Sequence, residues 1–124
     1  MQRRQLRVMV VDDDKSIIEM FKDVFKDAIR GEVVSTAGNG GEAVTKYASL
    51  KPCPDVVLMD ERMPGMSGLA ATKKILEMDS SAKIVFVSAD WAVKQEAMNA
   101  GARCFIQKPF RIDELKACLD RALN

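Results

Sequence analysis

Carboxylate, hydroxyl and ammonium side chains follow short apolar runs in this sequence. Asp12 and Asp13 follow VMVV, Asp60 follows VVLM, Ser88 follows IVFV, and Lys108 comes shortly after CFI. A carboxylate held beside a hard cation can act as a nucleophile toward a phosphoryl group. A lysine and a serine hydroxyl can neutralise or hydrogen-bond the transferred oxygens. The residue types therefore predict phosphoryl-transfer chemistry, provided that the fold brings them together.

A cation is expected wherever several of these carboxylates meet. Two carboxylates about 4 Å apart repel by about 4 kcal/mol at an effective dielectric constant near 20, so Asp12, Asp13 and Asp60 would need a counter-ion. The chain has no histidine, which excludes histidine metal ligands, general bases and triads. Oxygen ligands alone select a hard ion. We expect Mg²⁺, for which Mn²⁺ can substitute.

Each of these residues also has an ordinary structural interpretation. DDDK can be the acidic start of a helix, and we assign Asp14 to that role as a helix cap. An isolated Asp60 before a Pro-Gly turn is commonly a surface turn residue. Taken alone, Lys108 would be a solvated lysine and Ser88 a loop serine. Their joint occurrence after successive apolar runs favours the functional interpretation.

The elements that must position these side chains are visible as changes of period. Runs without apolar/polar alternation predict strands buried on both faces, at residues 8–11, 32–35, 56–59, 84–87 and 104–106. Helical spacing lies between and after them, strongly around Ile17–Ala28, Leu69–Leu76 and Ile112–Ala122, and weakly at 41–49 and 92–100.

This alternation predicts an α/β fold of five βα units. The expected architecture is a doubly wound, five-stranded parallel sheet with helices on both faces, joined by right-handed crossovers. In such sheets ligands bind beyond the carboxyl ends of the strands. The chemically capable residues occupy those ends, so we expect one site there.

Length and charge limit the other possibilities. A chain of 124 residues suits one domain, spanning residues 1–124, with residues 1–6 as a flexible tail. The net charge is +1, from 19 basic and 18 acidic side chains. No overall field draws such a protein to nucleic acid or anionic lipid. We therefore expect no direct nucleic-acid binding and no membrane association.

The cysteines and the leader indicate a cytoplasmic protein. Cys53, Cys104 and Cys118 are odd in number and lack CxxC spacing, which argues against a disulfide framework or zinc site and predicts small apolar packing residues. The basic leader precedes only four apolar residues, too few for a signal-peptide core or a membrane span.

Four motifs in order resemble a known family across essentially the whole chain. VVDDDKS, VVLMDERMPGMSG, VSA and IQKPF are similar to the motifs of the receiver domain of two-component response regulators. The resemblance implies a flavodoxin-like, CheY-like fold, and the strand order 2-1-3-4-5 is taken from that family. It also implies that the domain is a signalling phosphoacceptor with limited self-phosphorylation and self-dephosphorylation, and otherwise no enzyme.

The resemblance implies a role for each matching residue. Asp12 and Asp13 would hold Mg²⁺ together with Asp60 and the backbone carbonyl of Arg62, and Asp60 would be the phosphoacceptor. The remaining implied roles are phosphoryl binding and signalling by Ser88, Ala89 and Lys108, an aromatic switch at Phe105, and a cis bond before Pro109. From its strand pattern alone, Phe105 is a core residue.

Two further positions are expected to tune the site. Arg62 and Asp90 each lie two residues beyond a site residue, and opposite charges there can pair across the entrance. Such a pair would hinder the water that hydrolyses aspartyl phosphate. The alternative is that both side chains are solvated and never meet.

The partners are likewise implied by the resemblance. A sensor histidine kinase or a phosphotransfer protein would supply the phosphoryl group, and a downstream protein would bind the face formed by residues 92–100, 104–106 and 112–122. The domain would be a monomer or a phosphorylation-dependent dimer. Two alternatives stay open: a small aspartyl-phosphate phosphatase or phosphotransferase, and a phosphate-independent interaction module. Against the first, Asp60-Glu61-Arg62 lacks the Asp-x-Asp order of haloacid-dehalogenase-like enzymes.

Overall fold

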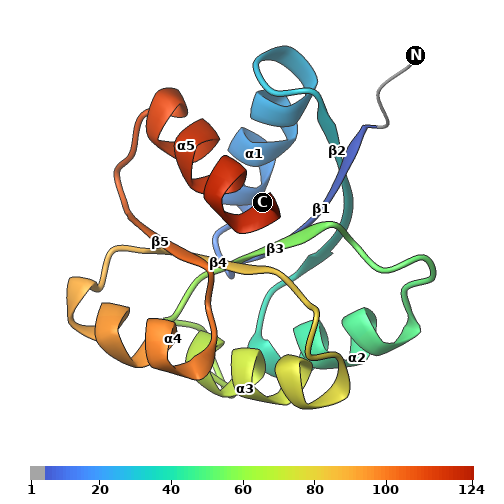
Figure 1. The fold of residues 1–124 in the computed structure, drawn as a ribbon, viewed down its shortest axis with the longest axis vertical. Helices are drawn as coiled ribbons and strands as arrows, with labels where there is room; N and C mark the ends of the chain where they lie inside the picture. Colours follow the sequence, from blue (N-terminus) through green and yellow to red (C-terminus); the bar gives the residue numbers. More distant parts are fainter. Residues whose placement is uncertain (1–4) are drawn as a thin grey trace.

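Five parallel strands form one sheet between two layers of helices (Figure 1). The computed structural model describes residues 5–124. Its elements are β1 (Leu6–Val11), α1 (Lys15–Asp27), β2 (Gly31–Ala37), α2 (Gly40–Ser49), β3 (Val56–Met59), α3 (Gly68–Met78), β4 (Ile84–Ser88), the 3₁₀ helix η1 (Trp91–Val93), α4 (Lys94–Ala100), β5 (Cys104–Gln107) and α5 (Ile112–Leu123).

The strand order is β2-β1-β3-β4-β5, and every neighbouring pair is parallel. Helices α1 and α5 cover one face, and α2, α3 and α4 cover the other (Figure 1). The predicted α/β fold, with its strand order, is therefore confirmed. No helix among residues 5–124 is long and apolar enough to cross a membrane.

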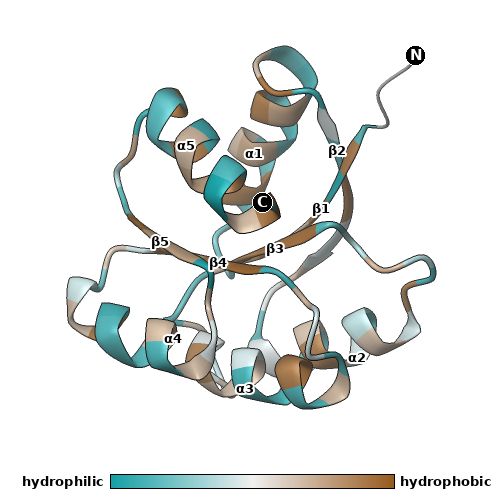
Figure 2. Cartoon of the chain, in the orientation of Figure 1, coloured by the Kyte–Doolittle hydropathy of each residue, from teal (hydrophilic) through white to brown (hydrophobic). Residues whose placement is uncertain are grey.

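The core lies on both sides of the sheet because the inner strands are apolar on both faces. Strands β3, β4 and β5 are coloured mainly as hydrophobic in Figure 2, and all residues of β3 and β4 are buried. Val10 and Leu58 pack toward α1 and α5, whereas Met9 and Met59 pack toward the opposite layer. Burial on two faces explains the absence of alternation in these runs.

Some element boundaries differ from those expected. The first strand begins at Leu6, the last residue of the expected tail, while residues 1–4 lie outside the described residues. Arg7 belongs to this strand because it pairs with Glu32 of β2, and its backbone N–H also donates to Asp55 Oδ2 at 2.7 Å. The helix expected at 92–100 is divided into η1 and α4, since Asp90 caps a separate short turn.

Polar side chains cap the helices that leave the carboxyl edge of the sheet. Asp14 caps α1 by accepting from the Ser16 backbone N–H at 2.9 Å, as predicted. The other three side-chain caps on this edge are Asn39 for α2, Ser67 for α3 and Asp90 for η1. A capped helix start has few unsatisfied N–H groups. The loops that carry the candidate site are thereby held at both ends.

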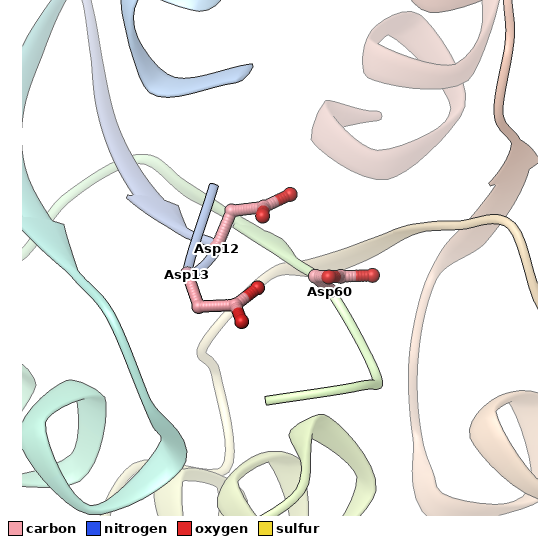
Figure 3. Close-up of side chains that lie close together, drawn as sticks. All are labelled: Asp12, Asp13 and Asp60. Carbon is pink, nitrogen blue, oxygen red and sulfur yellow. The ribbon is translucent and has the colours of Figure 1, made fainter. Parts of the chain in front are cut away.

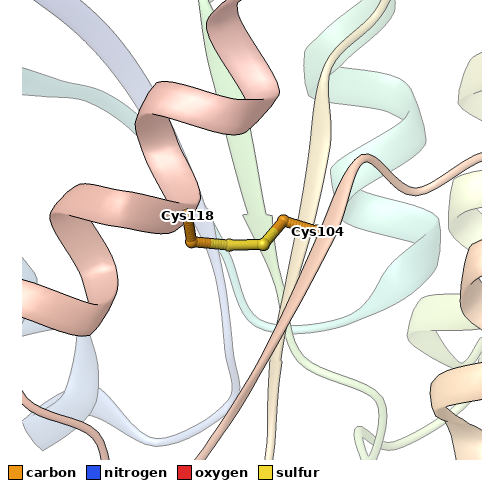
Figure 4. The surroundings of a disulfide bond; sticks show 2 residues. All are labelled: Cys104 and Cys118. Carbon is orange, nitrogen blue, oxygen red and sulfur yellow. A yellow bond between two sulfur atoms is a disulfide. The ribbon is translucent and has the colours of Figure 1, made fainter.

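The expectation that the cysteines form no disulfide is wrong. Cys104 on β5 and Cys118 on α5 form a disulfide, with their Cα atoms 5.9 Å apart (Figure 4). Cys104 and Cys118 are buried in the core, as expected of packing residues, whereas Cys53 is free and exposed and does not fit that expectation. A separation of 14 residues carries no recognisable motif. The pairing arises because α5 folds back onto the strand that precedes it.

Candidate functional site

Three carboxylates converge at the carboxyl ends of β1 and β3 (Figure 3). Asp12 and Asp13 follow β1 and Asp60 follows β3, and these strands are neighbours in the sheet. One carboxylate oxygen from each residue lies within 4.8 Å of the other two. We call these three residues the acidic cluster. The sheet thus brings together the carboxylates that lie far apart in the sequence.

Backbone hydrogen bonds hold the main chain of Asp12 and Asp60 in place. The Asp60 N–H donates to the Val11 carbonyl at 3.0 Å, and the Asp12 N–H donates to the Ala37 carbonyl at 2.9 Å. Both bonds extend the strand pairing one residue beyond the sheet. The carboxylates are therefore positioned by the sheet, which is the most rigid part of the fold.

Lys108 brings a positive charge to the acidic cluster. Its Nζ lies 2.7 Å from Asp12 Oδ2 and 3.5 Å from Asp60 Oδ1. The Lys108 N–H donates to the Ser88 carbonyl at 3.0 Å, and the Lys108-Pro109 bond is cis, as the resemblance implies. A second cis bond, Lys51-Pro52, was not expected.

The acidic cluster has more negative than positive charge. Burial raises the pKa of Asp60, which is only 8% exposed; the Lys108 ammonium opposes this rise and the Asp12 carboxylate adds to it. One lysine cannot balance three carboxylates. Carboxylate oxygens at this spacing, without nitrogen or sulfur donors, fit a hard divalent cation.

Beside the acidic cluster is a small cavity of about 240 Å³. Ser88, 1% exposed, lies against it, and its Oγ accepts from the Asp90 N–H at 3.0 Å. The cavity, which we call the site cavity, is lined by Asp60, Arg62, Ser88, Ala89, Asp90 and Lys108. All six are residues that the sequence analysis singled out. The volume exceeds that of several water molecules and can hold a small anion.

A larger hollow, of about 770 Å³, lies at the opposite end of the sheet. Residues that precede the strands line it, among them Gln5, Asp55 and Lys83, together with Tyr47 and Asp79. None of the acidic cluster reaches it. We place the chemistry at the smaller cavity because a potential nucleophile, a lysine and a hydroxyl converge there.

Arg62 and Asp90 meet at the mouth of the site cavity. Arg62 Nη2 lies 3.5 Å from Asp90 Oδ2, with 82% of the Arg62 side chain and 22% of the Asp90 side chain exposed. The alternative in which the two never meet is therefore not the arrangement seen. The ligand role of the Arg62 carbonyl stays a prediction.

Phe105 lies outside the site cavity, on the face of the sheet toward α4. It is partly buried and stacks on Phe86 with ring centroids 6.3 Å apart. It also forms an edge-to-face pair with Trp91, with ring centroids 5.6 Å apart. Phe86 belongs to the strand that ends in Ser88. Phe105 is therefore connected to Ser88 through Phe86, which lies on the same strand as Ser88. The role of Phe105 as a switch stays a prediction.

Two residues that hold the loop after Asp60, Gly68 and Glu61, were not predicted from the sequence. Gly68 lies so close to the Asp60 carbonyl that a Cβ at this position would collide with it. The Gly68 N–H also donates to the Glu61 carbonyl at 3.1 Å, and Glu61 Oε1 accepts from the Leu69 N–H at 2.8 Å. The available signal was a glycine, a poor helix former, directly after the cap Ser67.

Comparison with known proteins agrees with this geometry. The family model for the response regulator receiver domain matches residues 8–120. The chain is 44% identical over 117 residues to the chemotaxis protein CheY of Thermotoga maritima, covering 93% of this chain and 95% of that protein.

Two solved structures share the fold at substantial identity. The response regulator domain of CheB from Thermotoga maritima superposes with a TM-score of 0.87 at 34% identity, covering 98% of each chain. The response regulator TrrA from the same organism, solved in complex with Mg²⁺ and BeF, gives a TM-score of 0.84 at 33% identity, covering 96% of this chain and 100% of that one. The chain therefore belongs to the response regulator receiver domain family and is a receiver domain of the CheY type.

Proposed function

We propose that Asp60 is the phosphoacceptor of a Mg²⁺-dependent signalling switch. A carboxylate oxygen of Asp60 attacks the phosphorus of a phosphohistidine, so that an O–P bond forms and the N–P bond breaks. The observation that carries this proposal is the position of Asp60 against the site cavity, between Asp12 and Lys108. The histidine leaves with the electron pair of the broken bond and takes up a proton.

We assign the metal to the acidic cluster and the Arg62 backbone carbonyl. When bound, Mg²⁺, or Mn²⁺ in its place, supplies positive charge that neutralises the transferred oxygens. The uncompensated carboxylates and the purely oxygen donor set support this assignment. A similar structure, that of TrrA, is described in complex with Mg²⁺ and BeF.

Ser88, Ala89 and Lys108 take the phosphoryl side of the cavity. The Ser88 hydroxyl and the Ala89 backbone N–H donate hydrogen bonds to phosphoryl oxygens, and the Lys108 ammonium turns from Asp12 toward them. Movement of Ser88 toward the phosphoryl group makes room beside β4, and Phe105 rotates into it. The lining of the site cavity and the stacking of Phe105 on Phe86 support this sequence.

The partners follow from the same switch. A sensor histidine kinase or a phosphotransfer protein supplies the phosphoryl group in the cytoplasm, and a downstream protein binds the face formed by α4, β5 and α5. The domain acts as a monomer or a phosphorylation-dependent dimer, and it contacts neither nucleic acid nor membrane. Its own catalysis is limited to self-phosphorylation and self-hydrolysis.

Acetyl phosphate with Mg²⁺ tests the phosphoacceptor directly. Intact-mass spectrometry should detect one acid-labile phosphate on the wild type and none on Asp60→Asn. A matched control is Asp79→Asn, which removes an aspartate at the other end of the sheet and should be labelled like the wild type. Labelling of Asp60→Asn at the wild-type level would show that the phosphoacceptor is another residue.

A further inference from the structure

The two disulfide-bonded cysteines join the two elements that border one surface groove. Cys104 lies on β5, an edge strand, and Cys118 lies on α5, which packs against it (Figure 4). Both are almost completely buried, at 6% and 4% exposure. Both also line a groove of about 410 Å³, the β5–α5 groove, together with Trp91, Phe105, Gln107, Pro109 and Arg121.

We propose that Cys104 and Cys118 form a reversible thiol–disulfide pair that fixes α5 to β5 and so sets the shape of the β5–α5 groove. Thiols are kept reduced in a cytoplasm, where the disulfides that do form are mostly catalytic or redox-sensing. This step rests on the location proposed above. In that compartment the pair is a dithiol at rest and a disulfide under oxidising conditions.

The oxidant is a low-molecular-weight disulfide, RSSR. One cysteine thiolate attacks RSSR, which forms a mixed disulfide and releases one RSH after proton uptake. The second cysteine, having lost its proton, attacks the protein sulfur of that mixed disulfide and releases a second RSH. The two cysteines lose two electrons and two protons, and RSSR gains them. Excess RSH reverses both steps.

The fold separates this pair from the third cysteine. Cys53 is exposed in the loop before β3 and lines the large hollow at the amino ends of the strands. Cys104 and Cys118 belong, with Leu115 and Leu119, to the core cluster between the sheet and α5, and they reach the surface at the groove. Exchange with RSSR therefore proceeds through the groove, and Cys53 cannot substitute for either partner.

The disulfide constrains the chain segment that forms much of the β5–α5 groove. Residues 104–118 lie within the closed loop, and they include Gln107, Pro109 and Glu114, which line the groove. When the link is present, α5 cannot move away from β5. When it is absent, noncovalent packing alone holds the helix, and α5 opens more readily. A partner that fits one width of the groove then distinguishes the two redox states.

The test uses the full chain carrying Cys53→Ser, equilibrated across a range of reduced to oxidised glutathione ratios. After acid quenching and alkylation, peptide mass spectrometry should find both remaining thiols free at the reducing end. At the oxidising end it should find a linked peptide containing Cys104 and Cys118. For a loop of this length, oxidation should raise the melting temperature by roughly 10 °C. Hydrogen exchange of α5 amides should slow in parallel.

Single variants keep the proposal falsifiable. Cys118→Ser, or Cys118→Ala if the serine variant does not fold, should show the same melting temperature in both buffers and leave Cys104 alkylated or joined to glutathione. The proposal is overturned if Cys104 and Cys118 remain free at every ratio. It is equally overturned if they form the link but the exchange of α5 amides is the same in both states. Because no phosphorylation is involved, neither result bears on Asp60.

Discussion

At the carboxyl ends of β1 and β3, the three carboxylates of the acidic cluster have the Lys108 ammonium as their counter-charge. At the amino ends of the strands, the Asp79 carboxylate instead accepts hydrogen bonds from neighbouring hydroxyl groups. Tyr47 Oη donates to Asp79 Oδ2 at 2.7 Å, and the Ser81 hydroxyl donates to Asp79 Oδ1 at 2.7 Å. The pKa values follow this difference: hydrogen bonds lower that of Asp79, and burial raises that of Asp60.

The difference separates a structural use of aspartate from a functional one. A carboxylate that accepts hydrogen bonds from several donors within the protein stabilises the fold and binds a further ligand only weakly. A carboxylate whose charge is unsatisfied weakens the fold until a cation or a phosphoryl group arrives. Asp79 illustrates the first case and Asp60 the second.

Removing the positive charge of Lys108 should have the largest effect on this contrast. In the absence of metal, Lys108→Ala leaves the buried Asp12 carboxylate without its positively charged partner. The free energy of unfolding should fall by about 3 kcal/mol. This value is at the low end of the range for a broken buried ion pair, because Lys108 is partly exposed. Urea denaturation measures this loss. Lys83→Ala, at the amino end, is the control, and we expect less than about 0.5 kcal/mol.

The same variant distinguishes the two kinds of site residue. Lys108→Ala should retain Mg²⁺ affinity yet fail to convert modification into a conformational change, because we assign the lysine to the phosphoryl oxygens. Asp13→Ala should lose Mg²⁺ affinity, because we assign the aspartate to the metal. Titration of Trp91 fluorescence with Mg²⁺ measures the metal affinity of both variants, and the change in Trp91 fluorescence after addition of acetyl phosphate measures the response to modification. Equal loss of Mg²⁺ binding would mean that the roles are wrongly assigned.

Removing one donor at the amino end should have an intermediate effect. Tyr47→Phe deletes the bond to Asp79 and should cost about 1.5 kcal/mol near neutral pH. The folded-state pKa of Asp79 lies below its usual value of 3.8, so its stabilisation is present above that value and is lost as the pH falls through the folded pKa. The difference between variant and wild type should therefore shrink in acid.

Without metal, the contribution of Asp60 to stability should depend on pH in the opposite direction from that of Asp79. Its folded-state pKa is raised, so its neutral form is favoured in the folded protein, and stability is lost as the pH rises through that value. In chelator at neutral pH, Asp60→Asn should be more stable than the wild type. In acid the two should converge. A neutral-pH destabilisation by this variant would contradict the assignment of an unsatisfied carboxylate.

The Arg62–Asp90 pair at the mouth of the site cavity should have the smallest effect. Exposed pairs contribute about 0–1 kcal/mol, so Arg62→Ala and Asp90→Asn should each speed loss of the phosphoryl group roughly threefold, which corresponds to about 0.7 kcal/mol. The asparagine retains the cap that Asp90 provides to η1. Trp91 fluorescence follows the decay.

The double variant tests whether the two side chains act together. Arg62→Ala combined with Asp90→Asn should be no faster than the quicker single variant, because either change alone already breaks the pair. Fully additive effects would show that the side chains act independently.

Much of the fold could be predicted from particular residues. Runs such as VVLM and IVFV are buried on both faces and lack alternation, so their strand assignment followed from physics. Leu6 and Arg7 were missed because a charged residue interrupts the apolar run, although its backbone bonds to Asp55. The strand order came from the family resemblance, since the spacing of elements does not determine it.

The residues of the candidate site were predicted more completely than the packing and the covalent link that surround them. Five of the six residues lining the site cavity lie within the four motifs, and the sixth, Asp90, was singled out because it lies two residues beyond Ser88. The tight approach of Gly68 to the Asp60 carbonyl was not foreseen, because it depends on how α3 enters the fold. The Cys104–Cys118 link was missed for a similar reason: only the return of α5 onto β5 brings two unmarked cysteines together.

The contrast between the two ends is tested most directly by thermal unfolding of matched variants, Asp13→Asn and Asp79→Asn, with and without Mg²⁺. In chelator, Asp13→Asn should raise the free energy of unfolding by about 1 kcal/mol by relieving repulsion, and Asp79→Asn should lower it by a similar amount. Mg²⁺ at 100 times its dissociation constant should stabilise wild type and Asp79→Asn by about 2.7 kcal/mol, and Asp13→Asn far less. Destabilisation by both variants in chelator, or equal stabilisation of all three proteins by Mg²⁺, would contradict the account.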